Sequence, residues 1–120
     1  MNIKDSMGRA TKIRAVVFDN DGVLTDNTEI IGFPDGTVLK RRSHYDGQGI
    51  SFLRAIGIRI VIITGDKGKG AEAITQLVAK WNGLPSVDPA GWALVDLFTG
   101  YSGKAKIEAF KAWLDSNSIS

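Results

Sequence analysis

The sequence predicts an α/β fold in which helices cover both faces of a parallel sheet. Two short apolar runs rich in β-branched residues, at residues 13–18 and 58–63, each end abruptly in polar residues. Apolar residues at helical spacing follow these runs, at residues 46–56 and 69–81. Strands that alternate with helices are typical of βαβ units, and open parallel sheets bind ligands at the carboxyl ends of their strands. The residues that directly follow the strands are therefore the candidates for function.

Length and composition indicate one ordinary globular domain. The chain has 120 residues, 43% of them hydrophobic and 23% charged, with a net charge of +2 and no cysteine. We expect a flexible lead-in at residues 1–11 and a single domain over residues 12–120. The small charge excess requires no nucleic-acid or membrane partner, and the lack of cysteine excludes disulfides and thiolate chemistry. No apolar run could span a bilayer or serve as a signal core, so a cytoplasmic location is expected.

The segment between the two apolar runs predicts a hairpin and a helix. Residues 28–40 contain two β-prone runs around the turn sequence Pro-Asp-Gly, which predicts a β-hairpin flap. Asp46 is placed to cap a helix that ends near residue 56, before Gly57. The buried face of this helix is predicted to carry Ile50, Leu53 and Ile56.

The second half of the chain predicts two more helices and a third strand. A helix over residues 69–81 and a strand over residues 92–98 are separated by a loop, and a last helix opens near Lys104. Trp92 could line a pocket, but core packing is the favoured prediction. The residues predicted to face inward from the two helices are Ala73, Ile74, Leu77, Val78, Trp81, Ile107, Phe110, Trp113 and Leu114.

Two polar motifs follow the first two apolar runs. The run from Asp19 to Asp26 reads Asp-Asn-Asp-Gly-Val-Leu-Thr-Asp, and Thr64-Gly65-Asp66 follows residues 58–63. An isolated Asp-x-Asp-Gly or Thr-Gly is usually only a solvated turn. Here both motifs follow strands in order, which favours a catalytic site at one edge of the sheet.

These motifs resemble motifs I and II of the haloacid dehalogenase (HAD) superfamily, in its capless branch that contains 3-deoxy-D-manno-octulosonate 8-phosphate (KDO 8-phosphate) phosphatases. The resemblance implies a Rossmann-like three-layer core with a hairpin flap in place of a cap domain. It also implies Mg²⁺-dependent hydrolysis of a phosphate monoester, such as a sugar phosphate or a keto-sugar acid phosphate. Asp19 would be the nucleophile and Asp21 the general acid and base, and both would hold Mg²⁺. Thr64 would stabilise the phosphoryl group, with Asn20 and Gly65 also assigned to phosphate binding.

Elementary chemistry supports these roles. A carboxylate such as Asp19 can form an aspartyl-phosphate, provided that a cation offsets its repulsion from the phosphate dianion. Mg²⁺ prefers the oxygen ligands that carboxylates and carbonyls supply. The second carboxyl, Asp21, can protonate the leaving alkoxide and later activate water. A hydroxyl and free N–H groups at a helix start, as after Thr64, suit an oxyanion.

The family's motif III is a lysine at a junction between a strand and a helix. Lys104 matches this lysine best, and Lys106 is the alternative. Such a lysine would neutralise both the phosphoryl group and Asp19. The family usually carries arginine where this chain has Asp66, with Lys67 and Lys69 nearby, so the role of Asp66 stays open. The roles of His44 and of the Arg41-Arg42 pair also stay open.

The family's motif IV, a strand that ends in an acidic pair, has no match in the chain. We therefore expect a C-terminally truncated HAD core with an open sheet edge beside the first strand, either a fragment or a short form whose metal site is completed in another way. The branch forms tetramers in which flaps meet across subunits, so a homotetramer is expected. The alternative function is a non-catalytic assembly module that keeps the fold. A phosphomutase is disfavoured because no cap domain separates motifs I and II.

Overall fold

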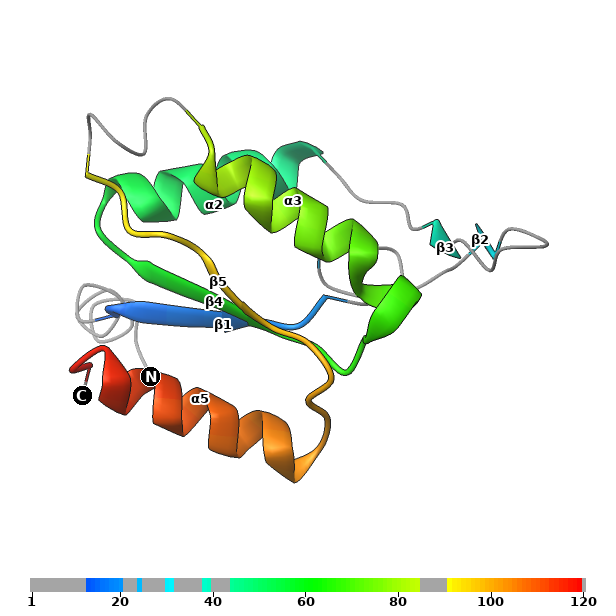
Figure 1. The fold of residues 1–120 in the computed structure, drawn as a ribbon. Helices are drawn as coiled ribbons and strands as arrows, with labels where there is room; N and C mark the ends of the chain where they lie inside the picture. The colour runs from blue at the N-terminus through cyan, green and yellow to red at the C-terminus, as the bar shows by residue number, and fades with distance from the viewer. Residues whose placement is uncertain are drawn as a thin grey trace, which may run out of the picture.

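The computed structural model describes residues 13–20, 24, 30–31, 38–39, 44–84 and 91–119. Its centre is a three-stranded parallel sheet with strand order β1-β4-β5. Helices α2 and α3 cover one face of this sheet, and α5 covers the other (Figure 1). The predicted three-layer α/β class is therefore confirmed. The bounds are β1 Ala15–Phe18, β4 Arg59–Ile63, β5 Asp96–Phe98, α2 His44–Ala55, α3 Glu72–Asn82 and α5 Lys104–Ser116, with a 3-10 turn at Gly68–Ala71 before α3.

The central strand β4 explains why the sheet needs helices on both faces. Ile60 and Ile62 belong to a core cluster with residues of α2 and α3, whereas Val61 and Ile63 pack with Trp113 of α5. All four side chains are at most 1% exposed. A parallel strand buried on both faces reads as a continuous apolar run, which is why the sequence predicted it.

The register brings the carboxyl ends of the strands to one edge. Phe18 of β1 pairs with Ile62, and Ile63 pairs with Phe98 of β5. The amide of Thr64 continues the ladder, because it donates a hydrogen bond of 3.0 Å to the carbonyl of Phe98. The turns that follow the three strands therefore meet at this edge, as predicted.

Helix α2 differs from its prediction at its N-terminus and at the last residue of its apolar stripe. It begins at His44, so Asp46 lies inside the helix and the prediction that it is the N-cap is wrong. Ile50 is buried as predicted, but Ile56 is 73% exposed because the helix ends at Ala55. Arg54 takes the inward place, since it lies four residues after Ile50 on the same helix face. The end at Gly57 is confirmed, with a φ of 89°.

Helices α3 and α5 match their predicted faces with one exception each. Ile74, Leu77, Val78 and Trp81 are buried, but Ala73 is exposed. In α5, Trp113 is buried and both Phe110 and Leu114 pack beside it, but Ile107 is 58% exposed. Ile107 lies in the first turns of the helix, and within the described residues it is part of neither core cluster.

Strand β5 is shorter than predicted because side chains use the backbone groups that precede it. The guanidinium of Arg54 donates to the carbonyl of Ala93, with distances of 3.0 and 3.1 Å. The side chain of Asn82 bonds both backbone groups of Val95, at 2.8 and 3.0 Å. The prediction of a strand from residue 92 is therefore wrong, and the ladder begins at Asp96.

The predicted hairpin is present as two short strands. β2 (Ile30–Ile31) and β3 (Val38–Leu39) pair antiparallel, with Ile30 opposite Leu39. They lie beyond the carboxyl edge of the sheet (Figure 1). The hairpin side chains, its turn and the lead-in at residues 1–11 lie outside the described residues.

Within the described residues, β1 pairs only with β4, so β1 is an edge strand of the described sheet. The open edge predicted beside the first strand is therefore present in the described part of the chain. Val17 on β1 is 39% exposed. None of the described helices is both long and apolar enough to cross a membrane.

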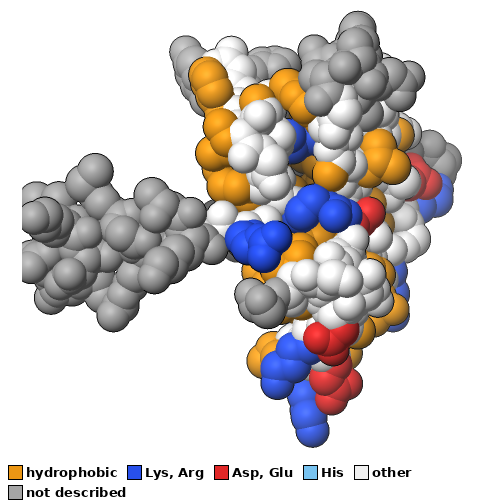
Figure 2. Space-filling view, turned by 90° about the vertical axis from the view of Figure 1, so that its left-hand side faces the viewer, with side chains coloured by type: hydrophobic (Ala, Val, Ile, Leu, Met, Phe, Trp, Pro, Cys, Tyr) orange, Lys and Arg blue, Asp and Glu red, His pale blue; other side chains and the backbone are white. Residues whose placement is uncertain are grey.

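The opposite, amino-terminal edge of the sheet has a different character. Figure 2 shows hydrophobic and basic side chains side by side on this face. A cavity of about 390 Å³ lies here, lined among others by Arg14, Arg59 and Asn117. Arg59 donates a hydrogen bond of 2.6 Å to the amide oxygen of Asn117, which ties β4 to the end of α5.

Candidate functional site

The turns after β4 and β5 are joined by backbone hydrogen bonds. The amide of Tyr101 donates to the carbonyl of Thr64 at 3.0 Å, and the amide of Gly100 donates to the carbonyl of Asp66 at 2.7 Å. Gly100 has a φ of 78°, a conformation that other residues rarely adopt. These bonds hold the turns after β4 and β5 together at the carboxyl edge of the sheet.

Asp19 stands directly after β1 with its carboxylate accessible. Its side chain is 47% exposed, and its Oδ1 lies 3.2 Å from the Nζ of Lys106. The backbone amide of Asn20 donates to the same oxygen at 2.8 Å. Both donors therefore contact the same carboxylate oxygen, Oδ1. An accessible anionic oxygen beside a cation is what a nucleophilic carboxylate needs.

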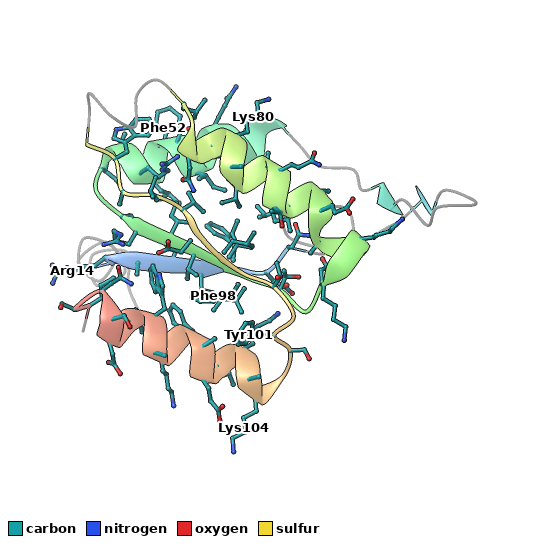
Figure 3. The ribbon with its side chains drawn as sticks, viewed as in Figure 1. Arg14, Phe52, Lys80, Phe98, Tyr101 and Lys104 are labelled. Atoms are coloured by element: carbon teal, nitrogen blue, oxygen red, sulfur yellow. The ribbon has the colours of Figure 1, made fainter. Side chains whose placement is uncertain are left out.

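The structure brings Lys106, and not Lys104, to Asp19. Two residues that are two apart in a helix point about 200° away from each other, so only one of these lysines can face the sheet. Lys104 is exposed, and Figure 3 shows it directed away from the sheet. The contact predicted for Lys104 is made instead by Lys106, the alternative named from the sequence.

Thr64 begins the second turn and is almost completely buried, at 1% exposure. Its hydroxyl oxygen accepts a hydrogen bond of 3.1 Å from the amide of Asp66, which leaves the hydroxyl hydrogen for a second partner. Gly65 is exposed, and a Cβ placed on it would lie 3.4 Å from the Cβ of Ser102. The turns after β4 and β5 thus approach to about van der Waals contact at Gly65.

The side chain of Asn20, a residue that the resemblance assigns to phosphate binding, contacts the turn after β4. Its side chain is 1% exposed and donates a hydrogen bond of 3.1 Å from Nδ2 to the Oδ2 of Asp66. The amide is thus directed into the protein, toward the second turn. Sequence reasoning did not find this contact, and its only signal was the unusual acid at Asp66.

Of the two predicted metal ligands, Asp19 lies among the described residues. Asp19 is accessible, and its carboxylate oxygens are of the kind that Mg²⁺ binds, so this residue fits a hard divalent cation. Asp21, the second predicted ligand, lies outside the described residues, as do the side chain of His44 and the Arg41-Arg42 pair. The described residues contain no cluster of three or more His, Cys, Asp or Glu that could hold a metal.

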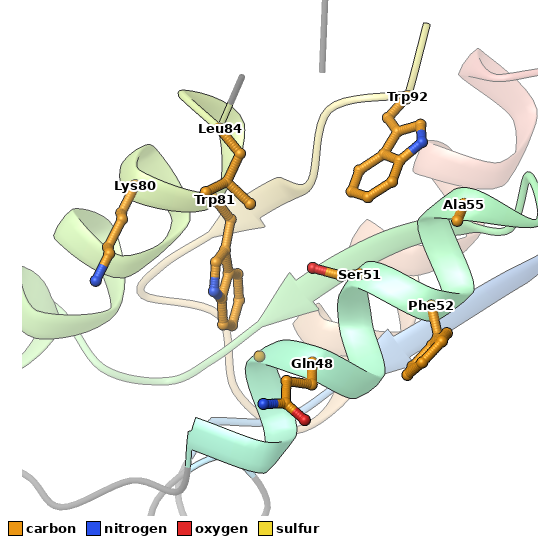
Figure 4. A pocket seen from close by; sticks show the side chains of 9 residues that line it. Gln48, Ser51, Phe52, Ala55, Lys80, Trp81, Leu84 and Trp92 are labelled. Carbon is orange, nitrogen blue, oxygen red and sulfur yellow. The ribbon is translucent and has the colours of Figure 1, made fainter. Parts of the chain in front are cut away.

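A second cavity lies away from Asp19, between α2 and α3. It has a volume of about 640 Å³, and Figure 4 shows the rings of Trp81 and Trp92 on its two sides. Trp92 therefore lines a cavity, the alternative named from the sequence, and it is not part of the two core clusters that the favoured prediction required. The guanidinium of Arg54 lies 5.5 Å from the centre of the Trp92 ring. A cation above an aromatic face is attracted by its quadrupole.

The fold is shared with solved structures that are described as HAD hydrolases and as a YrbI family phosphatase. No family model matches the chain. A solved chain from Pseudomonas syringae pv. phaseolica 1448a, described as a probable YrbI family phosphatase, superposes with a TM-score of 0.70 at 31% identity. The match covers 98% of this chain and 57% of that chain.

The sequence is similar to curated KDO 8-phosphate phosphatases. The enzyme of Escherichia coli strain B is 40% identical over 68 residues, which is 57% of this chain and 36% of the relative. The solved KDO 8-phosphate phosphatase of Moraxella catarrhalis, in complex with magnesium, phosphate and KDO, shares the fold with a TM-score of 0.71 at 23% identity. This comparison covers 99% of this chain and 59% of that one. The chain therefore spans little more than half the length of these solved structures.

Proposed function

We propose that this chain is the catalytic core of a Mg²⁺-dependent phosphate monoester hydrolase that acts through an aspartyl-phosphate on Asp19. The observation that carries the proposal is the accessible Asp19 carboxylate at the carboxyl end of β1, 3.2 Å from Lys106. The similarity to KDO 8-phosphate phosphatases supports a phosphatase and a sugar-derived phosphate as its substrate class.

In the first step an oxygen of Asp19 attacks phosphorus, and the bond between phosphorus and the ester oxygen breaks. Asp21 gives a proton to the leaving alkoxide. In the second step water attacks the aspartyl-phosphate, Asp21 takes up a proton, and release of phosphate restores the Asp19 carboxylate. Splitting one displacement into two steps lowers each barrier.

The described residues supply the charge and hydrogen bonds that these steps need. Lys106 offsets negative charge at Asp19 and on the phosphoryl group, so we assign to Lys106 the role first given to Lys104. The Thr64 hydroxyl and the Gly65 amide are proposed to donate to phosphoryl oxygens. Mg²⁺, held by Asp19 and Asp21, would supply the remaining positive charge when bound.

The test is turnover of a generic phosphate ester, such as p-nitrophenyl phosphate, and of sugar phosphates, with and without Mg²⁺. Asp19→Asn should lower kcat by about a thousandfold or more, because an amide is a poor nucleophile. Circular dichroism should be unchanged, since the side chain is half exposed. Glu108→Gln, an exposed change on α5, is the matched control and should keep wild-type activity.

Retention of Mg²⁺-dependent activity by Asp19→Asn would remove Asp19 from the mechanism. A wild-type chain without turnover on any of these esters would contradict the proposal and favour the non-catalytic assembly module.

We also propose that the chain forms a homo-oligomer through the β2–β3 hairpin, a tetramer as the resemblance implies. A two-stranded hairpin is marginal in water by itself, and here it lies beyond the carboxyl edge of the sheet, where β3 adjoins α3 (Figure 1). Sedimentation velocity at micromolar concentration checks this, and a monomer would contradict it. The cytoplasmic location stays a prediction from the sequence.

A further inference from the structure

Asp66 bonds to all three turns at the carboxyl edge of the sheet. Its Oδ2 accepts a hydrogen bond of 3.1 Å from the side chain of Asn20, in the turn after β1. Its amide donates to the Thr64 hydroxyl oxygen at 3.1 Å, within its own turn. Its carbonyl accepts from the amide of Gly100 at 2.7 Å, in the turn after β5. One residue thus connects the carboxyl ends of all three described parallel strands.

The bond to Asn20 reaches Asp19 through a single residue. Asn20 is 1% exposed, so its amide group depends on a partner inside the protein. The backbone amide of the same Asn20 donates to Oδ1 of Asp19 at 2.8 Å. Loss of the Asp66 acceptor would leave a buried donor unpaired, and the backbone of Asn20 would shift to regain a partner. Such a shift would also turn the Asp19 carboxylate.

We propose that Asp66 is a positioning residue that sets the orientation of the Asp19 carboxylate by holding Asn20 in place. Its catalytic consequence rests on the proposed phosphatase activity, but the positioning itself does not. The carboxylate of Asp66 is engaged by the buried side chain of Asn20. The residue after Thr64-Gly65 therefore serves the geometry of the nucleophile in this chain.

Two substitutions separate the geometry of this contact from its charge. Asp66→Asn removes the charge but keeps an oxygen at the same position to accept from Asn20. Asp66→Glu keeps the charge but moves the acceptor by one methylene group. Glu108→Gln controls for the loss of one acidic side chain at an exposed place. Melting temperatures of all variants show whether any effect comes from unfolding.

Asp66→Asn should keep kcat within about threefold of wild type, and Asp66→Glu should lower kcat by about tenfold with KM changed less than twofold, since misplacement of a reacting group lowers kcat. A change in folding alone would lower the melting temperature without this contrast between the two variants. Wild-type kcat in Asp66→Glu, or a larger loss in Asp66→Asn than in Asp66→Glu, would overturn the proposal.

Hydrogen exchange of the Asn20 backbone amide, followed by NMR, tests the positioning without any turnover. Its exchange should be unchanged in Asp66→Asn and about tenfold faster in Asp66→Glu, because the bond to Asp19 is weakened. If the wild-type chain has no activity, the proposed function fails and this exchange rate alone decides the positioning role. Equal exchange in both variants would refute it. Should Asp66→Glu fail to fold, Asp66→Ser, which shortens the side chain, takes its place with the same expectations.

Discussion

Two basic side chains in this protein meet opposite surroundings. Lys106 is 31% exposed, and it pairs with the Asp19 carboxylate, which is 47% exposed. Arg54 is 3% exposed and donates hydrogen bonds to neutral oxygens: the carbonyls of Trp81 and Ala93 and the side-chain oxygen of Asn82. Lys106 remains accessible to a ligand, whereas Arg54 is hydrogen-bonded inside the protein.

The different burial of Arg54 and Lys106 determines what each positive charge can do. Burial lowers the pKa of the Arg54 guanidinium below its ordinary value, because the charged form loses its hydration. The hydrogen bonds and the negative end of α3 near Trp81 compensate that loss and join α2, α3 and the segment before β5. Lys106 and Asp19 are both partly exposed, so desolvation costs them little. Among the described residues, both keep hydrogen-bonding capacity for a substrate. The buried cation therefore serves stability, and the accessible one serves chemistry.

The largest effect is expected when the buried cation is removed. Arg54→Met should lower the free energy of unfolding by about 3 kcal/mol, because several buried carbonyl groups lose their donors. Urea denaturation measures it, and Arg14→Met, at an exposed position, is the control that should stay within about 0.5 kcal/mol of wild type. An equally small change in Arg54→Met would end the contrast drawn between the two cations.

Removal of the accessible cation should affect turnover and leave the fold intact. Lys106→Met should lower kcat by about a hundredfold, the size seen when one donor to a developing charge is lost. Lys104→Met, two residues earlier in the same helix, should change kcat less than twofold. Steady-state kinetics on one phosphate ester compares them. A larger loss in Lys104→Met would restore the assignment made from the sequence.

A smaller effect is expected at the aromatic ring beside Arg54. Trp92→Leu keeps an apolar side chain but removes the aromatic face, so the free energy of unfolding should fall by about 1 kcal/mol. In the double variant with Arg54→Met, the loss from Trp92→Leu should shrink, and this shows whether the two residues are coupled. Fully additive losses would mean that the contact contributes nothing.

Salt should produce the smallest effect. The pair of Asp19 and Lys106 is accessible to water, and such pairs typically contribute about 0.2 to 1 kcal/mol. Because salt screens exposed charges, the stability difference between wild type and Lys106→Met should fall below about 0.3 kcal/mol in about 1 M NaCl. A difference above about 1 kcal/mol that persists at high salt would show that Lys106 has a structural role like that of Arg54.

The sequence by itself determined the elements and their order. β4 is a continuous apolar run because both its faces are buried, and Asp19 and Thr64 follow strands directly, so their placement at one sheet edge needs only the chain order. The end of α2 at Gly57 is likewise a local signal, because the backbone there has a positive φ. Local patterns carry this information since it concerns neighbours along the chain.

The tertiary structure decided which side chains meet. Whether Lys104 or Lys106 faces Asp19 depends on how α5 is rotated against the sheet, which packing around Trp113 sets and no local pattern reports. The contact of Asn20 with Asp66 joins residues 46 positions apart, so it exists only once β1 and β4 are paired in register. Likewise, Arg54 is buried because three segments place their oxygen atoms around it. Contacts of this kind depend on distances that arise only when the elements pack together.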